Sequence, residues 1–236
     1  MLEAIKNTNI LFLDIETVPQ FPVYSEVPEK LQKLWDEKSK NFREEKTSED
    51  VYERAGIYAE FGKIICISVG AISEKPNRKI RLKSFFGDNE KQLLESFFQL
   101  LNSKFNRYEH FLCAHNGKEF DYPYIARRGL INGLKLPKIL DNSGKKPWEI
   151  KHLDTLELWK FGDYKHYTSL NLLTAIFDIP SPKDDISGAD VAKVYYIEKD
   201  LPRIVKYCEK DVLALAQLLL RYKSEMLIPE ENVEHV

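Results

Sequence analysis

An apolar run near the start of the chain ends in two carboxylates that stand one residue apart. Residues 10–13 are all apolar, and Asp14 and Glu16 follow them. Alternate side chains of a strand face the same side, so the two acids should project together. A divalent cation such as Mg²⁺ or Mn²⁺ would remove the repulsion between them. Because an Asp-x-Glu pair arises by chance about once in a chain of this length, the pair alone does not establish a metal site.

A second acidic motif follows a predicted strand over residues 110–114. An Asn116-Gly117 turn leads to Asp121, at the predicted start of a helix that continues to about Ile131. An acid at this position is often only a favourable helix cap. In open α/β sheets, however, sites gather beyond the carboxyl ends of strands. We therefore expect Asp121 to approach Asp14 and Glu16, and we interpret His115 as a local hydrogen-bonding residue.

A third candidate pair lies on a long helix near the end of the chain. Asp200-Leu201-Pro202 has the acid and the proline that begin many helices, and apolar periodicity continues to about Lys223. Tyr207 and Asp211 stand four residues apart, so they share one face of this helix. By itself this spacing carries little information.

The elements between these motifs predict a mixed sheet covered by helices. Residues 63–73 and 79–86 read as a β-hairpin, so the first three strands should form an antiparallel meander. A helix capped by Asp88 should run to residue 105, and shorter helices should start near Thr168 or Ser169 and at Gly188. This alternation favours a single α/β domain over residues 1–236.

Residues 19–60 form a polar, highly charged insertion directly after the first strand. Leu31, Leu34, Trp35 and Phe42 follow a helical period and predict an amphipathic helix. This helix is either an ordinary surface helix or part of a flap over the site that ends at Glu16.

Composition excludes several classes of protein. The chain has 236 residues, a net charge of −2 and 43% hydrophobic residues, which predicts a large core but no global signature of a nucleic-acid binder. Cys66, Cys113 and Cys208 are too few and too dispersed for a disulfide framework or a zinc site, which fits a cytoplasmic protein. No apolar run approaches the ~20 residues of a membrane span. The lysines of residues 134–151 are either solvated or a rim that follows phosphates.

The three motifs, in this order and on a strand end, a helix start and a late helix, resemble the DEDD superfamily of 3′-5′ exonucleases. Tyr207, four residues before Asp211, is similar to the DEDDy branch, whereas the histidine branch would have His where this chain has Lys206. The Asp-x-Glu-Thr and Asn-x-x-x-Phe-Asp patterns are most similar to the proofreading domain of family B DNA polymerases and its stand-alone relatives. The resemblance spans about residues 9–220 and implies a ribonuclease H-like fold.

The resemblance also implies roles for individual residues. Asp14 would bridge two divalent metal ions, Mg²⁺ or Mn²⁺, while Glu16 and Asp211 complete one metal site and Asp121 holds the water shell of the second. Tyr207 would orient the attacking water. Two ions about 3.5–4 Å apart can activate a water and stabilise the leaving oxygen. The expected substrate contacts are Thr17, Asn116 and Phe120.

The implied activity is removal of nucleoside 5′-monophosphates from the 3′ end of single-stranded DNA. An exoribonuclease with the same chemistry is the nearest alternative, because only contacts around the terminal sugar sense the 2′-hydroxyl. A catalytically silent nucleic-acid-binding module is a third. Carboxylates without metal would repel phosphate, so the presence of all four acids and the tyrosine argues against that third interpretation.

Overall fold

A six-stranded mixed sheet forms the centre of the computed structural model, which describes residues 2–163, 167–180 and 186–236. The strand order is β5-β4-β1-β2-β3-β6. Strands β1, β2 and β3 pair antiparallel, while β4 is parallel to β1, β5 to β4 and β6 to β3. The predicted meander and the mixed sheet are confirmed. The strands are β1 Ile10–Pro19, β2 Gly62–Ser73, β3 Lys79–Phe86, β4 Phe111–Ala114, β5 Leu153–Asp154 and β6 Val233–His235.

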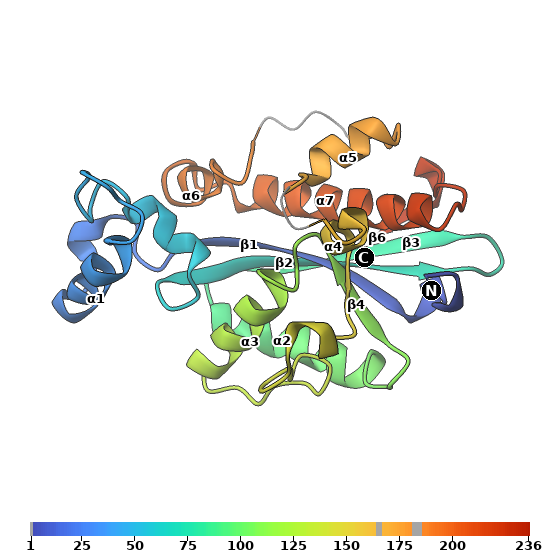
Figure 1. The fold of residues 1–236 in the computed structure, drawn as a ribbon, viewed down its shortest axis with the longest axis horizontal. Coiled ribbons are helices and arrows are strands. Elements are labelled where there is room, and N and C mark those ends of the chain that lie inside the picture. Colours follow the sequence, from blue (N-terminus) through green and yellow to red (C-terminus); the bar gives the residue numbers. More distant parts are fainter. Residues whose placement is uncertain (1, 164–166, 181–185) are drawn as a thin grey trace.

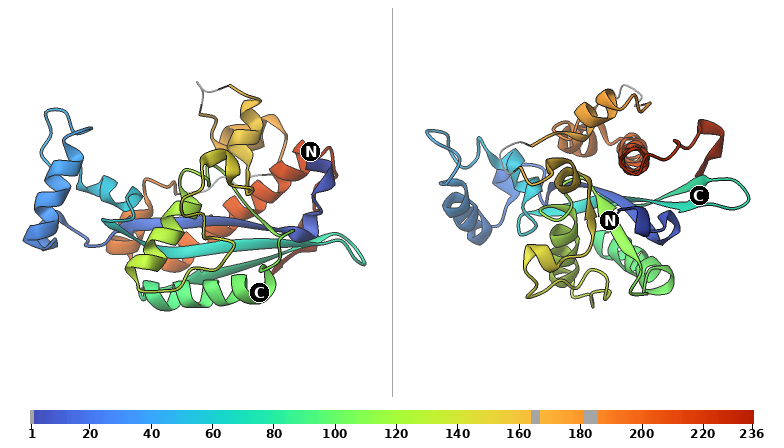
Figure 2. Two further views of the ribbon diagram at one scale, coloured as in Figure 1. Left: turned by 60° about the horizontal axis from the view of Figure 1, so that its bottom comes forward. Right: turned by 45° about the vertical axis from the view of Figure 1, so that its right-hand side comes forward.

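Helices cover both faces of the sheet (Figures 1 and 2). Helices α2 and α3 bury residues such as Phe97 and Ile125 against one face, and α7 buries Val212 and Leu215 against the other. Helix α5 lies on the outer side of α7 (Figure 1). The helices are α1 Glu29–Ser39, α2 Glu90–Lys104, α3 Asp121–Ile131, α4 Thr155–Lys160, α5 Leu170–Ile176, α6 Val191–Lys193 and α7 Leu201–Tyr222.

The predicted starts of three helices match the structure, and the starts of two others do not. Helix α3 begins at Asp121, α5 is capped by Ser169, and the side chain of Asp200 accepts a hydrogen bond from the Arg203 amide at the start of α7. The predicted Asp88 cap is wrong: Asn89 caps α2, while Asp88 accepts a hydrogen bond from the Tyr195 hydroxyl. The helix predicted to begin at Gly188 begins instead at Val191.

Residues 20–61 form a lobe that projects beyond the carboxyl end of β1 (Figure 1). Its core is aromatic, centred on the fully buried Trp35, whose ring has an edge-on contact with Tyr52 at 6.0 Å. The predicted amphipathic helix exists as α1, but Leu34 is largely exposed and Phe42 follows the helix. The aromatic cluster rather than a regular helical stripe therefore orders the lobe. Its role as a flap stays a prediction.

Candidate active site

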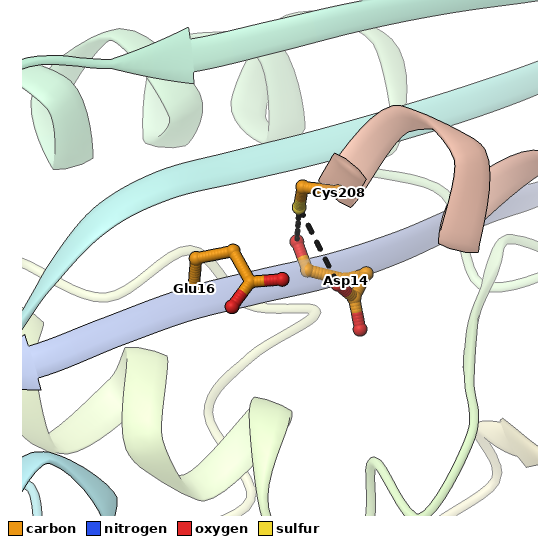
Figure 3. A group of neighbouring side chains, drawn as sticks. All are labelled: Asp14, Glu16 and Cys208. Atoms are coloured by element: carbon orange, nitrogen blue, oxygen red, sulfur yellow. Dashed lines mark hydrogen bonds between the residues drawn. The ribbon is translucent and has the colours of Figure 1, made fainter. Parts of the chain in front are cut away.

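Strand β1 presents Asp14 and Glu16 on the sheet face that α7 covers (Figure 3). Asp14 is partly buried and Glu16 is buried at 7% exposure. Immediately after Glu16 the pairing with β2 shifts, because Glu16 opposes Cys66 whereas Thr17 opposes Ile64. This β-bulge leaves Ile65 without a partner, and such irregularities bend a strand and redirect its side chains.

Asp121 reaches the same place from the first residue of α3. It is 3% exposed, and its carboxylate accepts a hydrogen bond from the backbone amide of Ile15, the residue between the two acids of β1. The predicted approach of Asp121 to Asp14 and Glu16 is therefore observed.

Helix α7 closes the cluster with Tyr207, Cys208 and Asp211. The Cys208 thiol lies 3.4 Å from Oδ2 of Asp14 and 3.5 Å from its backbone oxygen (Figure 3). Tyr207 and Asp211 are joined by a hydrogen bond between their side chains. Sequence reasoning treated Cys208 as one of three dispersed cysteines and missed its contact with Asp14. Its position next to Tyr207, one turn before Asp211, was the available signal.

Burial and repulsion between neighbouring carboxylates raise the pKa values of Asp14, Glu16 and Asp121. Burial is the largest cause for Asp14, followed by the charges of Asp121 and Asp211. Burial is also the largest cause for Glu16, followed by the charge of Asp14. The pKa of Asp121 is raised to about 7 by burial, with a further contribution from Asp154. Electrostatic repulsion among these four acids favours the binding of a cation between them.

The donor set fits a divalent ion with oxygen ligands. Ligand atoms of Asp14, Glu16 and Cys208 lie within 4.8 Å of one another. Carboxylate oxygens are the ligands that Mg²⁺ and Mn²⁺ prefer. Asp14 and Glu16, with Asp211 electrostatically coupled to both, would hold such an ion. The protonated thiol of Cys208, whose pKa is raised by burial, acts as a hydrogen-bond donor to Asp14.

Tyr207 is a neutral phenol at this site. Burial raises its pKa, and the charges of Asp211 and Glu16 raise it further. A phenol that stays protonated is a hydrogen-bonding group rather than a base at neutral pH.

A buried acid that sequence reasoning did not select, Asp154, orders the turn before Asp121. One of its oxygens accepts from the Asn116 amide at 2.9 Å and the other from the Lys118 amide at 3.0 Å. It also accepts from the Leu156 amide at the start of α4. Asn116 adopts a left-handed backbone conformation with φ of 63°, which asparagine tolerates better than most residues. Asp154 therefore fixes the path from β4 to α3.

The remaining predicted residues have local partners. His115 hydrogen-bonds to Thr155 and to the Thr168 carbonyl, as a local hydrogen-bonding residue should. Phe120 is partly buried, with its ring 5.3 Å from the ring of Tyr124.

Thr17 links the site to the lobe through Tyr124. The Thr17 side chain hydrogen-bonds to the Tyr124 hydroxyl, which donates to the Gly56 carbonyl at 2.7 Å. The Thr17 hydroxyl thus has a structural partner in addition to any contact with substrate.

A row of hydroxyl groups crosses the sheet beside Asp14. Asp14 opposes Ser68 on β2, and Ser68 opposes Ser84 on β3. The two serine oxygens are 2.8 Å apart, and Ser84 donates to Glu209 of α7 at 2.7 Å. Because Glu209 lies between Tyr207 and Asp211 in sequence, this row fixes the position of the segment of α7 that bears both residues.

Replacing Ser84 by alanine should lower turnover by roughly 5–30-fold, since one partly buried hydrogen bond to a carboxylate is worth about 1–2 kcal/mol. The Michaelis constant should change little. Ser84→Thr keeps the hydroxyl on a strand and should restore the parent rate. Equal turnover in the alanine variant and the parent would contradict a positioning role.

A protein-family model matches residues 57–230, about three quarters of the chain. It is described as a predicted 3′-5′ exonuclease related to the exonuclease domain of PolB. The chain belongs to this family. The matched range contains Asp121, Tyr207 and Asp211, while Asp14 and Glu16 precede it.

The chain is similar to DNA polymerases that are several times its length. It is 24% identical to a DNA polymerase of Pyrococcus glycovorans over 140 residues, or 55% of this chain and 18% of the polymerase. It is 25% identical to DNA polymerase 1 of Pyrococcus abyssi over 177 residues, or 67% of this chain and 22% of the polymerase. The chain thus spans about a fifth of these relatives.

A solved structure confirms the fold. The family B DNA polymerase of Pyrobaculum calidifontis superimposes with a TM-score of 0.53 at 17% identity, over 90% of this chain and 24% of the polymerase. The ribonuclease H-like, mixed α/β fold that the sequence predicted for this chain is therefore confirmed. Within the described ranges, no helix has both the length and the apolar character of a membrane span.

Proposed function

We propose that the protein is a metal-dependent exonuclease that hydrolyses the terminal phosphodiester bond at the 3′ end of single-stranded DNA. The observation that carries the proposal is the cluster of Asp14, Glu16, Asp121 and Asp211, assembled from β1, α3 and α7 around a shared electrostatic interaction. A binding-only module gains nothing from acids such as Glu16 and Asp121, which are buried and have raised pKa values, because they repel phosphate and cost stability without a cation.

In this proposal the chain binds two divalent ions, Mg²⁺ or Mn²⁺, which together lower the pKa of a bound water and neutralise charge on the leaving 3′ oxygen. Asp14 would serve both ions, while Glu16 and Asp211 would complete the ligands of one of them. Asp121 would orient water at the other. The Cys208 thiol donates to Asp14 and thereby limits the orientations of this carboxylate.

The hydroxyl of Tyr207 positions the attacking water in this scheme. Its hydrogen bond with Asp211 and its proximity to Glu16 support that role. The Asn116 turn and Phe120 flank Asp121 and are proposed to contact the terminal nucleotide, together with Thr17.

Tyr207→Phe should lower turnover by roughly 10–1000-fold, because it removes one positioning hydrogen bond and leaves the metal ligands in place. The apparent affinity for Mn²⁺ should stay close to that of the parent. Steady-state rates at saturating Mn²⁺ measure the effect. A variant as fast as the parent would make Tyr207 a packing residue.

The substrate is tested with matched DNA and RNA oligonucleotides labelled at the 5′ end. The proposal expects a ladder that shortens from the 3′ end, forms only with Mg²⁺ or Mn²⁺, and appears faster for DNA. An equal or higher rate on RNA would favour the exoribonuclease. Shortening from the 5′ end would contradict the proposal, and binding without any product would favour the silent module.

A further inference from the structure

A strongly basic surface lies on the α2–α3 side of the sheet. Residues 104–109, at the end of α2, and residues 134–151, between α3 and β5, form it together. These two stretches contain seven Lys and Arg and three Asp and Glu, although the whole chain has a net charge of −2. We call it the basic surface; its cations are Lys104, Arg107, Lys135, Lys138, Lys145, Lys146 and Lys151.

Most of these cations are not neutralised by a carboxylate. Within the described part of the chain, Arg107 contacts Glu109 at 3.7 Å, and the six lysines have no ion pair. Lysines elsewhere do pair, as Lys118 does with Glu157 at 2.7 Å. The basic surface therefore has a positive potential that an external anion can satisfy.

Two large aromatic side chains stand among the lysines. Trp148 is 77% exposed and Tyr108 is 88% exposed. The Lys146 ammonium lies 5.3 Å from the Trp148 ring centre, and that of Lys151 lies 4.4 Å from the ring centre of Tyr108. Exposed rings beside cations bind single-stranded nucleic acids well, because bases stack on the rings while the cations contact phosphates.

The surface is hollowed between these groups. A cavity of about 450 Å³ is lined by Arg107, Tyr108, Lys138, Lys145 and Lys151, among others. Partial burial lowers the pKa of Lys151, and the charge of nearby Lys145 lowers it further. A phosphate bound in the cavity would relieve this repulsion between ammonium groups.

We propose that the basic surface binds the backbone of a single-stranded nucleic acid, namely the part of the substrate strand that lies 5′ of the end under hydrolysis. This inference rests on the proposed exonuclease function. Lys151 is three residues before Asp154, no more than about 10 Å along the chain, and Asp154 orders the turn that leads to Asp121. Because β5 is an edge strand of the sheet, a single strand that leaves the carboxylates on the α7 face would pass this edge and meet the basic surface on the other face.

Binding is measured by fluorescence anisotropy in EDTA, with 5′-labelled oligothymidylates of 4 and 30 nucleotides. The parent should bind the 30-mer at least tenfold more tightly than either Trp148→Ala or the double variant Lys145→Ala/Lys146→Ala binds it. Removal of two phosphate contacts should also reduce the slope of log K against log salt by about 1.4. The double variant Lys83→Ala/Lys91→Ala removes two exposed lysines outside the surface and should bind like the parent.

Hydrolysis separates failure of this inference from failure of the proposed function. With Mn²⁺, the surface variants should raise the Michaelis constant for the 30-mer and leave the rate on the 4-mer unchanged. Unchanged binding and unchanged 30-mer kinetics in both surface variants would overturn the inference while the exonuclease stands. If the parent hydrolyses neither oligonucleotide, the exonuclease fails, and the anisotropy comparison in EDTA still decides whether the surface binds single strands.

Discussion

Asp14→Ala should abolish hydrolysis of DNA 3′ ends while the protein stays folded. Asp14 is the acid that interacts with both Asp121 and Asp211, so its loss removes the carboxylate proposed to join the two ion sites. Metal ions contribute several kcal/mol of transition-state stabilisation, which predicts a loss of at least about 10³-fold in turnover. Asp211→Ala should behave similarly.

The control for this experiment is Glu119→Ala, which removes an exposed acid two residues from Asp121. Its turnover should equal that of the parent. A near-parent rate in Asp14→Ala, with an unchanged melting temperature and saturating metal, would contradict the assigned site. A rate lost equally in Glu119→Ala would show that charge around the site, rather than metal ligation, governs turnover.

Asp121→Asn should stabilise the metal-free protein at pH 8 while it lowers activity. The folded-state pKa of Asp121 is raised to about 7 by burial, so the protonated acid stabilises the fold at low pH, and this contribution disappears as the pH rises from about 4 through 7. Asparagine resembles the protonated acid at every pH. The expected gain is about 1–4 kcal/mol at pH 8, or roughly 2–4 °C in melting temperature per kcal/mol.

Thermal melts in EDTA and in Mn²⁺, at pH 5 and pH 8, measure the effect. Mn²⁺ should raise the melting temperature of the parent more at pH 8 than at pH 5, because it binds the ionised acids of the folded state. The Asn variant should show a smaller metal effect at pH 8. A parent that melts at the same temperature in EDTA and in excess Mn²⁺ would exclude a metal site at these carboxylates.

The sequence predicted those parts of the fold that follow from local patterns. The Asp-x-Glu strand, the turn before Asp121 and the caps at Ser169 and Asp200 depend on residues close in the chain, and the structure has them where expected. The prediction that Asp88 caps α2 was wrong. The hydroxyl of Tyr195, more than 100 residues away in sequence, donates a hydrogen bond to the Asp88 carboxylate, and Asn89 caps the helix instead.

Contacts between distant segments were the part that sequence reasoning could not supply. Cys208 belongs to the apolar residues that recur with a helical period along α7. Its thiol nevertheless contacts Asp14, because α7 crosses β1 at this point. Ser68 and Ser84 look like ordinary strand residues until the register of β2 and β3 pairs them and aligns them with Glu209. Register and helix crossing arise from the packing of the whole sheet, so such partners are found only in three dimensions.

The most direct test of the central claim is the product released from a single-stranded DNA labelled in its 3′-terminal nucleotide. With Mg²⁺ or Mn²⁺ the parent should release the label as one nucleoside 5′-monophosphate from the first turnover, and neither the parent in EDTA nor Asp14→Ala should release it. Release of the label in a longer fragment, or at the same rate in EDTA, would contradict a metal-dependent 3′-5′ exonuclease.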